Sequence, residues 1–147
     1  MSMLALQRSR GFTLIELLVV IVLIGVSIGL ISFGVGKGLQ SAKERQALTQ
    51  LVQSLRAARV QAIVTGQPAQ TRFDLRHARF HGPDQKAHSL PQDMHLQLVT
   101  AEGLGAAFEF YPDGGSSGGH LLVSRNDQHW RIDINWLTGN VQLHALK

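Results

Sequence analysis

A long apolar run near the start of the chain dominates its hydrophobic pattern. From Phe12 to Gly36 nearly every residue is apolar, and Glu16 is the only ionisable side chain. A helix rises about 1.5 Å per residue, so about 20 apolar residues span the hydrocarbon core of a bilayer. The pattern therefore predicts a transmembrane helix segment over residues 12–36.

The next segment, residues 37–66, carries apolar residues at helical spacing. They recur three and four positions apart, at Leu48, Leu51, Val52, Leu55, Ala58, Ala62 and Ile63. This spacing predicts an amphipathic continuation of the helix. Polar residues fall largely off its apolar stripe, namely Lys43, Glu44, Gln50, Arg56 and Arg59. Gly66 and Pro68 predict the end of one long helix at about residue 65, with the stripe facing a sheet; a membrane-surface or calmodulin-like helix is the alternative.

From residue 67 onward the period of the pattern changes to two. Apolar residues alternate with polar ones at Phe73 and Leu75, at Met94, Leu96 and Leu98, at Phe108 and Phe110, at Leu121 and Val123, and from Trp130 to Trp136. The alternation predicts half-buried antiparallel strands with one face on the helix. A helix followed by strands indicates an α+β fold, with a long N-terminal helix packed on antiparallel sheet and a β-rich globular domain over residues 67–147. We expect a less regular connection around residues 76–105.

Composition and charge narrow the possible locations. The chain has 147 residues, no cysteine and a formal charge of +4. Disulfides and thiolate metal sites are therefore excluded, but a periplasmic location is not. Arg8 and Arg10 precede the apolar run, and positive residues tend to stay on the cytoplasmic side. We expect a single pass with a cytoplasmic N-terminus and a periplasmic C-terminal domain. A cleaved signal peptide is a poorer interpretation, because the run is long and no Ala-x-Ala pattern ends it.

The start of the apolar run carries a family resemblance. The stretch Arg10-Gly11-Phe12-Thr13-Leu14-Ile15-Glu16 resembles the processing signal of type IV pilins and type II secretion pseudopilins. The resemblance implies that residues 1–11 are a leader peptide, cut by a prepilin peptidase between Gly11 and Phe12. It also implies N-methylation of Phe12, and it makes Glu16 the fifth residue of the mature chain.

The resemblance gives Glu16 a physical role. A carboxylate inside a spanning segment costs about 2.5–3.5 kcal/mol on insertion scales, so an intramembrane acid is a functional candidate. Cleavage would create a positive amine at Phe12, and Glu16 lies one helical turn further on. Its carboxylate could pair with that amine, or with the same amine of a neighbouring subunit, and so set the axial register of an assembly. The alternative is an unprocessed membrane anchor.

A second resemblance lies near the other end of the chain. The stretch FEFYPDGGSSGGHLLV followed by WRIDINWLTGNVQL resembles the C-terminal signature of H-type minor pseudopilins and the related minor pilins. It implies a pilin-like, non-enzymatic subunit of the periplasmic pseudopilus, which drives export of folded proteins across the outer membrane. The implied partners are other major and minor pseudopilins, the prepilin peptidase/methyltransferase, the inner-membrane assembly platform and the lipid bilayer. The alternative is a minor type IV pilin, at a pilus tip or in DNA uptake.

The glycine-rich part of this signature invites a chemical interpretation. Asp113, Gly114, Gly118 and Gly119 frame a loop that we expect to be a flexible structural connection between Phe110 and Leu121. Phosphate binding is disfavoured because no Gly-Lys-Ser/Thr before a helix is present. Calcium is a better rival, although one acid is few for a calcium site.

Other catalytic and binding chemistry finds little support in the sequence. The seven histidines form no His-Glu-x-x-His pattern, and no Gly-x-Ser-x-Gly elbow occurs. We therefore expect no catalytic residue, metal or cofactor. A basic patch on the first hairpin could meet nucleic acid, with Arg72, Arg76, His77, Arg79 and His81. The modest net charge and neighbouring Asp74 argue against a nucleic-acid partner.

Overall fold

The structure divides into two compact units. The computed structural model describes the backbone of residues 13–146 and the side chains of residues 13–29 and 38–146. The two units are Met1–Ser41 and Ala42–Lys147. The predicted cleavage and methylation residues Gly11 and Phe12, and the predicted leader, lie outside the described residues.

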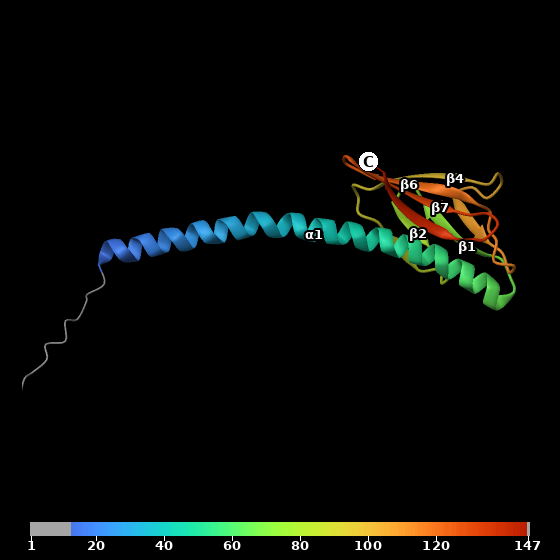
Figure 1. The fold of residues 1–147 in the computed structure, drawn as a ribbon, viewed down its shortest axis with the longest axis horizontal. Helices are drawn as coiled ribbons and strands as arrows, with labels where there is room; N and C mark the ends of the chain where they lie inside the picture. Colours follow the sequence, from blue (N-terminus) through green and yellow to red (C-terminus); the bar gives the residue numbers. More distant parts are fainter. Residues whose placement is uncertain (1–12, 147) are drawn as a thin grey trace, which may run out of the picture. The chain divides into compact units, whose positions relative to one another are not determined.

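One helix precedes eight strands along the described chain. The elements are α1 (Leu14–Thr65), β1 (Ala69–Asp74), β2 (Arg79–His81), β3 (Ala87–Ser89), β4 (His95–Thr100), β5 (Ala107–Phe110), β6 (Gly119–Arg125), β7 (Gln128–Ile134) and β8 (Val141–Leu146) (Figure 1). The strands form two four-stranded antiparallel sheets, ordered β3-β2-β1-β5 (sheet A) and β4-β6-β7-β8 (sheet B). The predicted α+β class, with a long helix on antiparallel sheet, is confirmed.

The first unit is helical where it is described, and its side chains face outward. Every described side chain from Leu14 to Gly29 is exposed. No helix among the described residues is both long enough and apolar enough to cross a bilayer. The span predicted at residues 12–36 includes Phe12 and the side chains of residues 30–36, which the structure does not describe.

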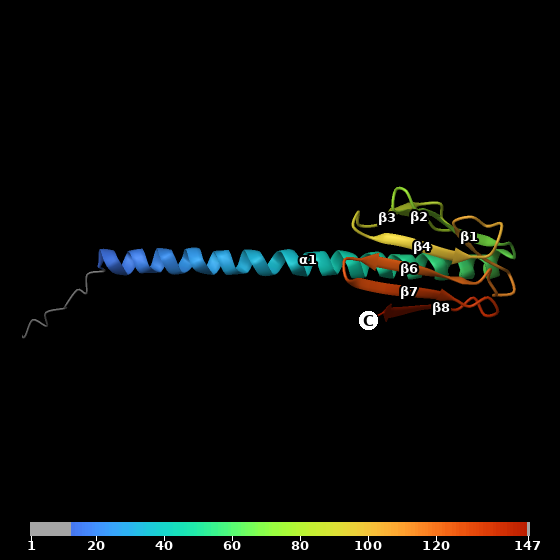
Figure 2. The ribbon, with the colours of Figure 1, turned by 90° about the horizontal axis from the view of Figure 1, so that it is seen from above.

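The core of the second unit lies between the C-terminal part of α1 and the two sheets. Figures 1 and 2 show both sheets on the same side of this helical segment. The predicted apolar stripe is buried at Leu48, Leu51, Val52, Leu55, Ala58 and Ala62. Opposite it lie Phe80 and Phe108 from sheet A and Leu121 and Ile132 from sheet B, all fully buried. The apolar residues at helical spacing on α1 and those at two-residue spacing on the strands therefore pack together in one core.

The end of α1 is the one that the sequence predicts. The helix stops at Thr65, and Gly66 follows with a φ of +68°. The Gly66 amide donates to the Ala62 carbonyl oxygen over 3.0 Å, which satisfies one of the carbonyls left free at a helix end.

Several local predictions are wrong, and each has a physical reason. Residues 76–105 hold β2, β3 and β4 instead of an irregular connection; β2 and β3 have three residues each, too few to show a period. Ile63 is 46% exposed although it was placed on the buried stripe, while Glu44 is buried although it was placed off it. The alternating run from Trp130 predicted a strand that continues to Trp136, but β7 ends at Ile134. The Asn135 side-chain oxygen accepts the amides of Leu137 and Thr138, and such a turn ends a strand.

Candidate functional site

The first turn of α1 holds Glu16 in a capping arrangement. Thr13 precedes the helix, and its side-chain oxygen lies 3.4 Å from the Glu16 amide. The order Thr13-Leu14-Ile15-Glu16 matches the capping box, in which Ser or Thr before a helix is followed three residues later by Glu or Gln. A negative side chain in the first turn also interacts favourably with the helix dipole. Thr13 therefore caps the helix, and Glu16 adds a negative charge to its first turn; the sequence analysis missed both local roles.

An apolar surface follows Glu16 along α1. Large side chains are exposed from Leu14, which is 82% exposed, to Ile28, which is 60% exposed. A helix that is apolar on all sides is normally covered by other protein or by lipid. Gly25 and Gly29, four residues apart, have nothing within 4 Å of an added Cβ.

The glycine-rich loop between β5 and β6 is ordered by hydrogen bonds instead of being flexible. The Ser116 amide donates to the Trp136 carbonyl oxygen over 2.8 Å, and the Ser116 hydroxyl donates to the Asn135 carbonyl oxygen over 3.0 Å. Arg59 Nε of α1 donates to the Gly114 carbonyl oxygen over 3.1 Å. The loop thus links the helix, β5 and the β7–β8 turn.

The glycines of this loop allow close backbone approach. Gly114, Gly118 and Gly119 have φ values of +89°, +69° and +118°, in the region that favours glycine. A Cβ at Gly119 would overlap the Val99 carbonyl oxygen, and a Cβ at Gly118 would lie 2.8 Å from the Trp136 Cβ. Glycine is needed here for packing against the neighbouring strand and turn.

The remaining member of the predicted loop set, Asp113, has a structural partner. Its Oδ1 accepts the Gly115 amide over 2.9 Å. In the part of the chain that the structure describes, no group of three or more His, Cys, Asp or Glu side chains could hold a metal ion. Asp113 therefore acts on the backbone of its own loop, and the arrangement gives no support to the calcium alternative.

A partly buried ion cluster joins three distant parts of the second unit, with Arg125 and Glu44 buried and Asp93 exposed. Arg125, at the end of β6, lies 2.9 Å from Glu44 of α1 and 2.6 Å from Asp93 in the turn before β4. The Arg125 side chain is 6% exposed. The pKa of Arg125 is raised, chiefly by its hydrogen bond to Asp93. Burial opposes this rise, and the contact with Glu44 adds to it. Sequence reasoning missed this cluster because its members are far apart in the chain and share no motif.

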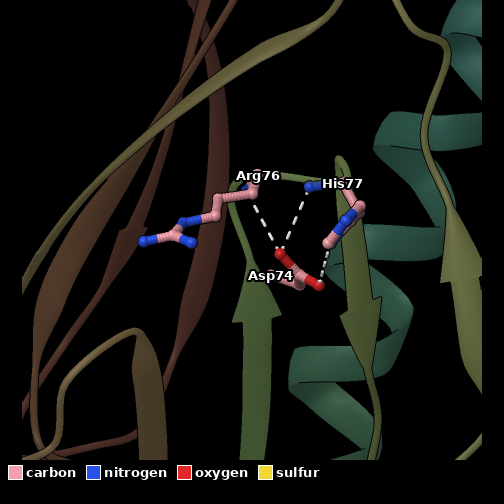
Figure 3. A network of polar contacts seen from close by, with 3 residues as sticks. All are labelled: Asp74, Arg76 and His77. Atoms are coloured by element: carbon pink, nitrogen blue, oxygen red, sulfur yellow. Dashed lines mark hydrogen bonds and ion pairs between the residues drawn. The ribbon is translucent and has the colours of Figure 1, made fainter.

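The predicted basic patch contains a self-contained turn. Asp74 Oδ1 accepts the amides of Arg76 and His77, and Asp74 Oδ2 lies 2.7 Å from His77 Nδ1 (Figure 3). The hydrogen bond with the His77 side chain is the main cause that lowers the pKa of Asp74. The Arg76 side chain points away from Asp74 in Figure 3. Part of the positive charge of this hairpin is therefore compensated locally, which does not favour a phosphate-binding surface.

Comparisons with known proteins match both ends of the chain. The family described as prokaryotic N-terminal methylation motif matches residues 6–32, and the family described as type II transport protein GspH matches residues 47–139. Type II secretion system protein H of Xanthomonas campestris pv. campestris is 31% identical over 146 residues, which cover 96% of this chain and 86% of that protein. The solved structure of the minor pseudopilin EpsH from the Type 2 Secretion System of Vibrio cholerae shares the fold, with a TM-score of 0.56, 17% identity, and coverage of 69% of this chain and 95% of that one.

Proposed function

Since this chain belongs to the GspH family of type II transport proteins and is a minor pseudopilin of a type II secretion system, we propose that it is a structural subunit of the periplasmic pseudopilus that drives export of folded proteins. The observation that carries the proposal is the presence of two family signatures on one chain, a methylation motif over residues 6–32 and a GspH region over residues 47–139. The family resemblance drawn from the sequence is thereby confirmed. The minor type IV pilin alternative is not favoured, because the family and the relative are both named for type II transport or secretion.

Maturation would begin at the N-terminus. A prepilin peptidase would remove residues 1–11, cut between Gly11 and Phe12, and methylate the new amine of Phe12. The match of residues 6–32 to the methylation motif supports this step. Before cleavage the chain would sit in the inner membrane with a cytoplasmic N-terminus, and residues 67–147 would lie in the periplasm.

Glu16 would then act in assembly. On α1, apolar side chains flank Glu16 in both directions along the helix, from Leu14 to Ile28. Its carboxylate would therefore enter an apolar environment when neighbouring subunits or lipid cover the helix. Pairing with the amine of Phe12, in the same or the next subunit, offsets that cost. The carboxylate would thereby fix the axial position of each subunit.

The capping box suggests a pair of variants that separates assembly from helix capping. Glu16→Gln keeps a side chain that can serve in a capping box but removes the charge, whereas Glu16→Ala removes both. If the charge sets register, both variants fail to enter the pseudopilus and secretion falls to a similar extent. If Glu16 only caps the helix, Glu16→Gln assembles like the natural protein and only Glu16→Ala is impaired.

The partners of the assembled subunit follow from the same role. As a pseudopilin, the chain associates with other pseudopilins of its secretion system. We propose contacts with major and minor pseudopilins along α1, with the inner-membrane assembly platform, and with the prepilin peptidase/methyltransferase. We propose that the subunit catalyses no reaction and needs no cofactor, which accords with membership of a family of secretion-system subunits.

A secretion assay tests the proposed function. In a strain that lacks its own copy of this protein, the natural chain should restore release of type II substrates into the medium. The processing variant Gly11→Leu should remain at the precursor mass and should not restore release. Full release by this unprocessed variant would contradict the proposal.

A further inference from the structure

Strand β8 forms an open edge of sheet B. In the sheet order β4-β6-β7-β8 it pairs with β7 alone, and Figure 2 shows it as the outermost strand, on the side away from sheet A. Its sequence, VQLHAL, holds no Asp, Glu, Lys, Arg or Pro. Charged residues and proline are the usual protection of an edge strand against pairing with another chain, and β8 lacks them.

The hydrogen-bond alternation of sheet B shows which backbone groups face outward. Arg125 and Gln128 flank the two-residue turn between β6 and β7 and face each other as a hydrogen-bonded pair. Hydrogen-bonded and non-hydrogen-bonded pairs alternate along antiparallel strands. The even-numbered residues of β7 therefore bond to β6, and the odd-numbered residues bond to β8. The register of β7 with β8 then makes Gln142, His144 and Leu146 the bonded residues of β8. The amide and carbonyl groups of Leu143 and Ala145 point to the open edge.

The start of the edge is closed by the helix, which confirms this direction. Arg56 of α1 donates from Nη2 to the Val141 carbonyl oxygen over 3.1 Å, so this carbonyl points away from β7. Val141 is buried, but Leu143, on the same face of the strand, is 41% exposed. An added strand beside Leu143 and Ala145 would satisfy their backbone groups and cover the Leu143 side chain.

The helix flank beside this edge is basic. Arg45 and Thr49 lie eleven and seven residues before Arg56, which places them on the same side of α1. All three are exposed. Among the described residues no carboxylate lies within ion-pair distance of Arg45 or Arg56. A strand added to β8 would therefore present its inward side chains to two arginines without acidic partners.

We propose that the β8 edge, with Arg45 and Arg56 of α1, is a docking site for an extended, carboxylate-bearing segment of a partner protein. Backbone groups of Leu143 and Ala145 recognise the extended chain, and the arginines select acidic side chains. A second copy of this chain is disfavoured as the occupant, because pairing β8 with β8 would bring two basic helix flanks together. The site is short, so it fits a transient contact instead of a permanent interface.

A defined peptide tests the proposal with the full chain in a non-ionic detergent. The probe is a fluorescent peptide of about ten residues in which Glu alternates with Val, and the comparison peptide alternates Lys with Val. Fluorescence anisotropy should show saturable binding of the acidic peptide that weakens with salt, and no binding of the basic one. Methylating alternate backbone amides of the acidic peptide, which removes strand hydrogen bonds but leaves the protein unchanged, should abolish binding.

Protein variants locate the binding. Arg45→Glu and Arg56→Glu should each lower the affinity for the acidic peptide by about tenfold, since each variant replaces an attraction by a repulsion. The matched control Arg76→Glu, on the β1–β2 turn, makes the same charge change far along the chain and should leave binding unchanged. In hydrogen exchange, the peptide should newly protect the amides of Leu143 and Ala145, while those of Gln142 and His144 are protected already.

Three results of the peptide-binding experiments would overturn the proposal. They are absence of saturable binding, equal binding by the Arg45→Glu and Arg76→Glu variants, and protection that appears elsewhere than at Leu143 and Ala145. Self-association in sedimentation experiments that disappears with Leu143→Pro would also overturn it, because the edge would then be occupied by a second copy. A processing or secretion defect does not affect this assay, so its outcome is independent of the proposed function.

Discussion

Gly139, in the turn between β7 and β8, is the position where the packing of the glycine-rich loop can be tested most sharply. Its φ is +62°, and an added Cβ would overlap the Gly114 carbonyl oxygen and lie 2.8 Å from Arg59 Nε. These two atoms are hydrogen-bonded to each other over 3.1 Å. Gly139→Ala must therefore displace the loop backbone and the helix side chain together.

Gly105 provides a matched control. Its φ is +66°, and nothing lies within 4 Å of an added Cβ. Gly105→Ala should lose only the left-handed backbone preference, about 1 kcal/mol. In Gly139→Ala the overpacking adds a further loss of about 1–3 kcal/mol, so we expect its free energy of unfolding to fall by about 3 kcal/mol.

Urea unfolding of the full chain in a non-ionic detergent measures both losses. Trp130 and Trp136 are the two tryptophans of the chain and both belong to the second unit, so tryptophan fluorescence reports the unfolding of this unit. The urea midpoint should fall further in Gly139→Ala than in Gly105→Ala, with an unchanged slope. Equal losses would refute the reasoning, because backbone strain alone would then explain both variants.

Three further predictions concern the helix core and two titrating groups. Leu55→Ala, at a fully buried position, should reduce the free energy of unfolding by about 2–5 kcal/mol, whereas Val64→Ala, at a residue 78% exposed, should change it by less than about 0.5 kcal/mol in the same urea assay. Because the folded-state pKa of Asp74 is lowered, its stabilising effect is present above its ordinary pKa and is lost as the pH falls through the folded-state value. Asp74→Asn should therefore lower the melting temperature at neutral pH, and the difference from the natural protein should shrink as the pH falls below the ordinary carboxyl pKa. A difference that stays the same across this range would contradict the reasoning. Burial, and then the charge of Glu109, raise the pKa of Tyr111 above 10.0. As this is the only tyrosine in the chain, the midpoint of its absorbance titration should lie above that value and should move down in Glu109→Gln. The free energy of unfolding should decline as the pH rises past the pKa that Tyr111 has in the unfolded chain.

The sequence predicts the large features of the fold because they rest on long periodic patterns. The stripe from Leu48 to Ala62 spans several turns, and Gly66 ends the helix by a local backbone conformation. The alternation of Leu121 with Val123 and of Ile132 with Ile134 likewise identifies buried strand faces. Such signals are strong because many residues agree on one period.

The features that the sequence analysis missed depend on contacts between distant residues or on short elements. Glu44 lies four residues before Leu48 on the buried side of α1, and the counter-charge that its burial requires comes from Arg125, 81 residues further on. Ile63 is 46% exposed although the preceding residue, Ala62, is fully buried, so Ile63 lies at the margin of the apolar stripe. The glycine-rich loop was expected to be flexible, since its composition is that of a turn; its order comes from Arg59 and from the backbone of the β7–β8 turn.

The candidate site divides in the same way. The roles of Gly11, Phe12 and Glu16 are predicted from a contiguous motif, and the match to the methylation family covers all three positions. The capping role of Thr13 follows from the spacing of three residues between Thr13 and Glu16, which the sequence also contains. The open edge of β8 could not be found, because it depends on which strand ends the sheet and on the helix flank that lies beside it.

The most direct test of the account is the intact mass and N-terminal sequence of the protein purified from its native membrane. We predict a chain that begins at Phe12, with the added mass of one methyl group on its N-terminal amine. This result would support processing as a pseudopilin and the role proposed for Glu16. A chain that begins at Met1, or one cut after the apolar run, would contradict the account, because no amine at Phe12 would then exist for Glu16 to pair with.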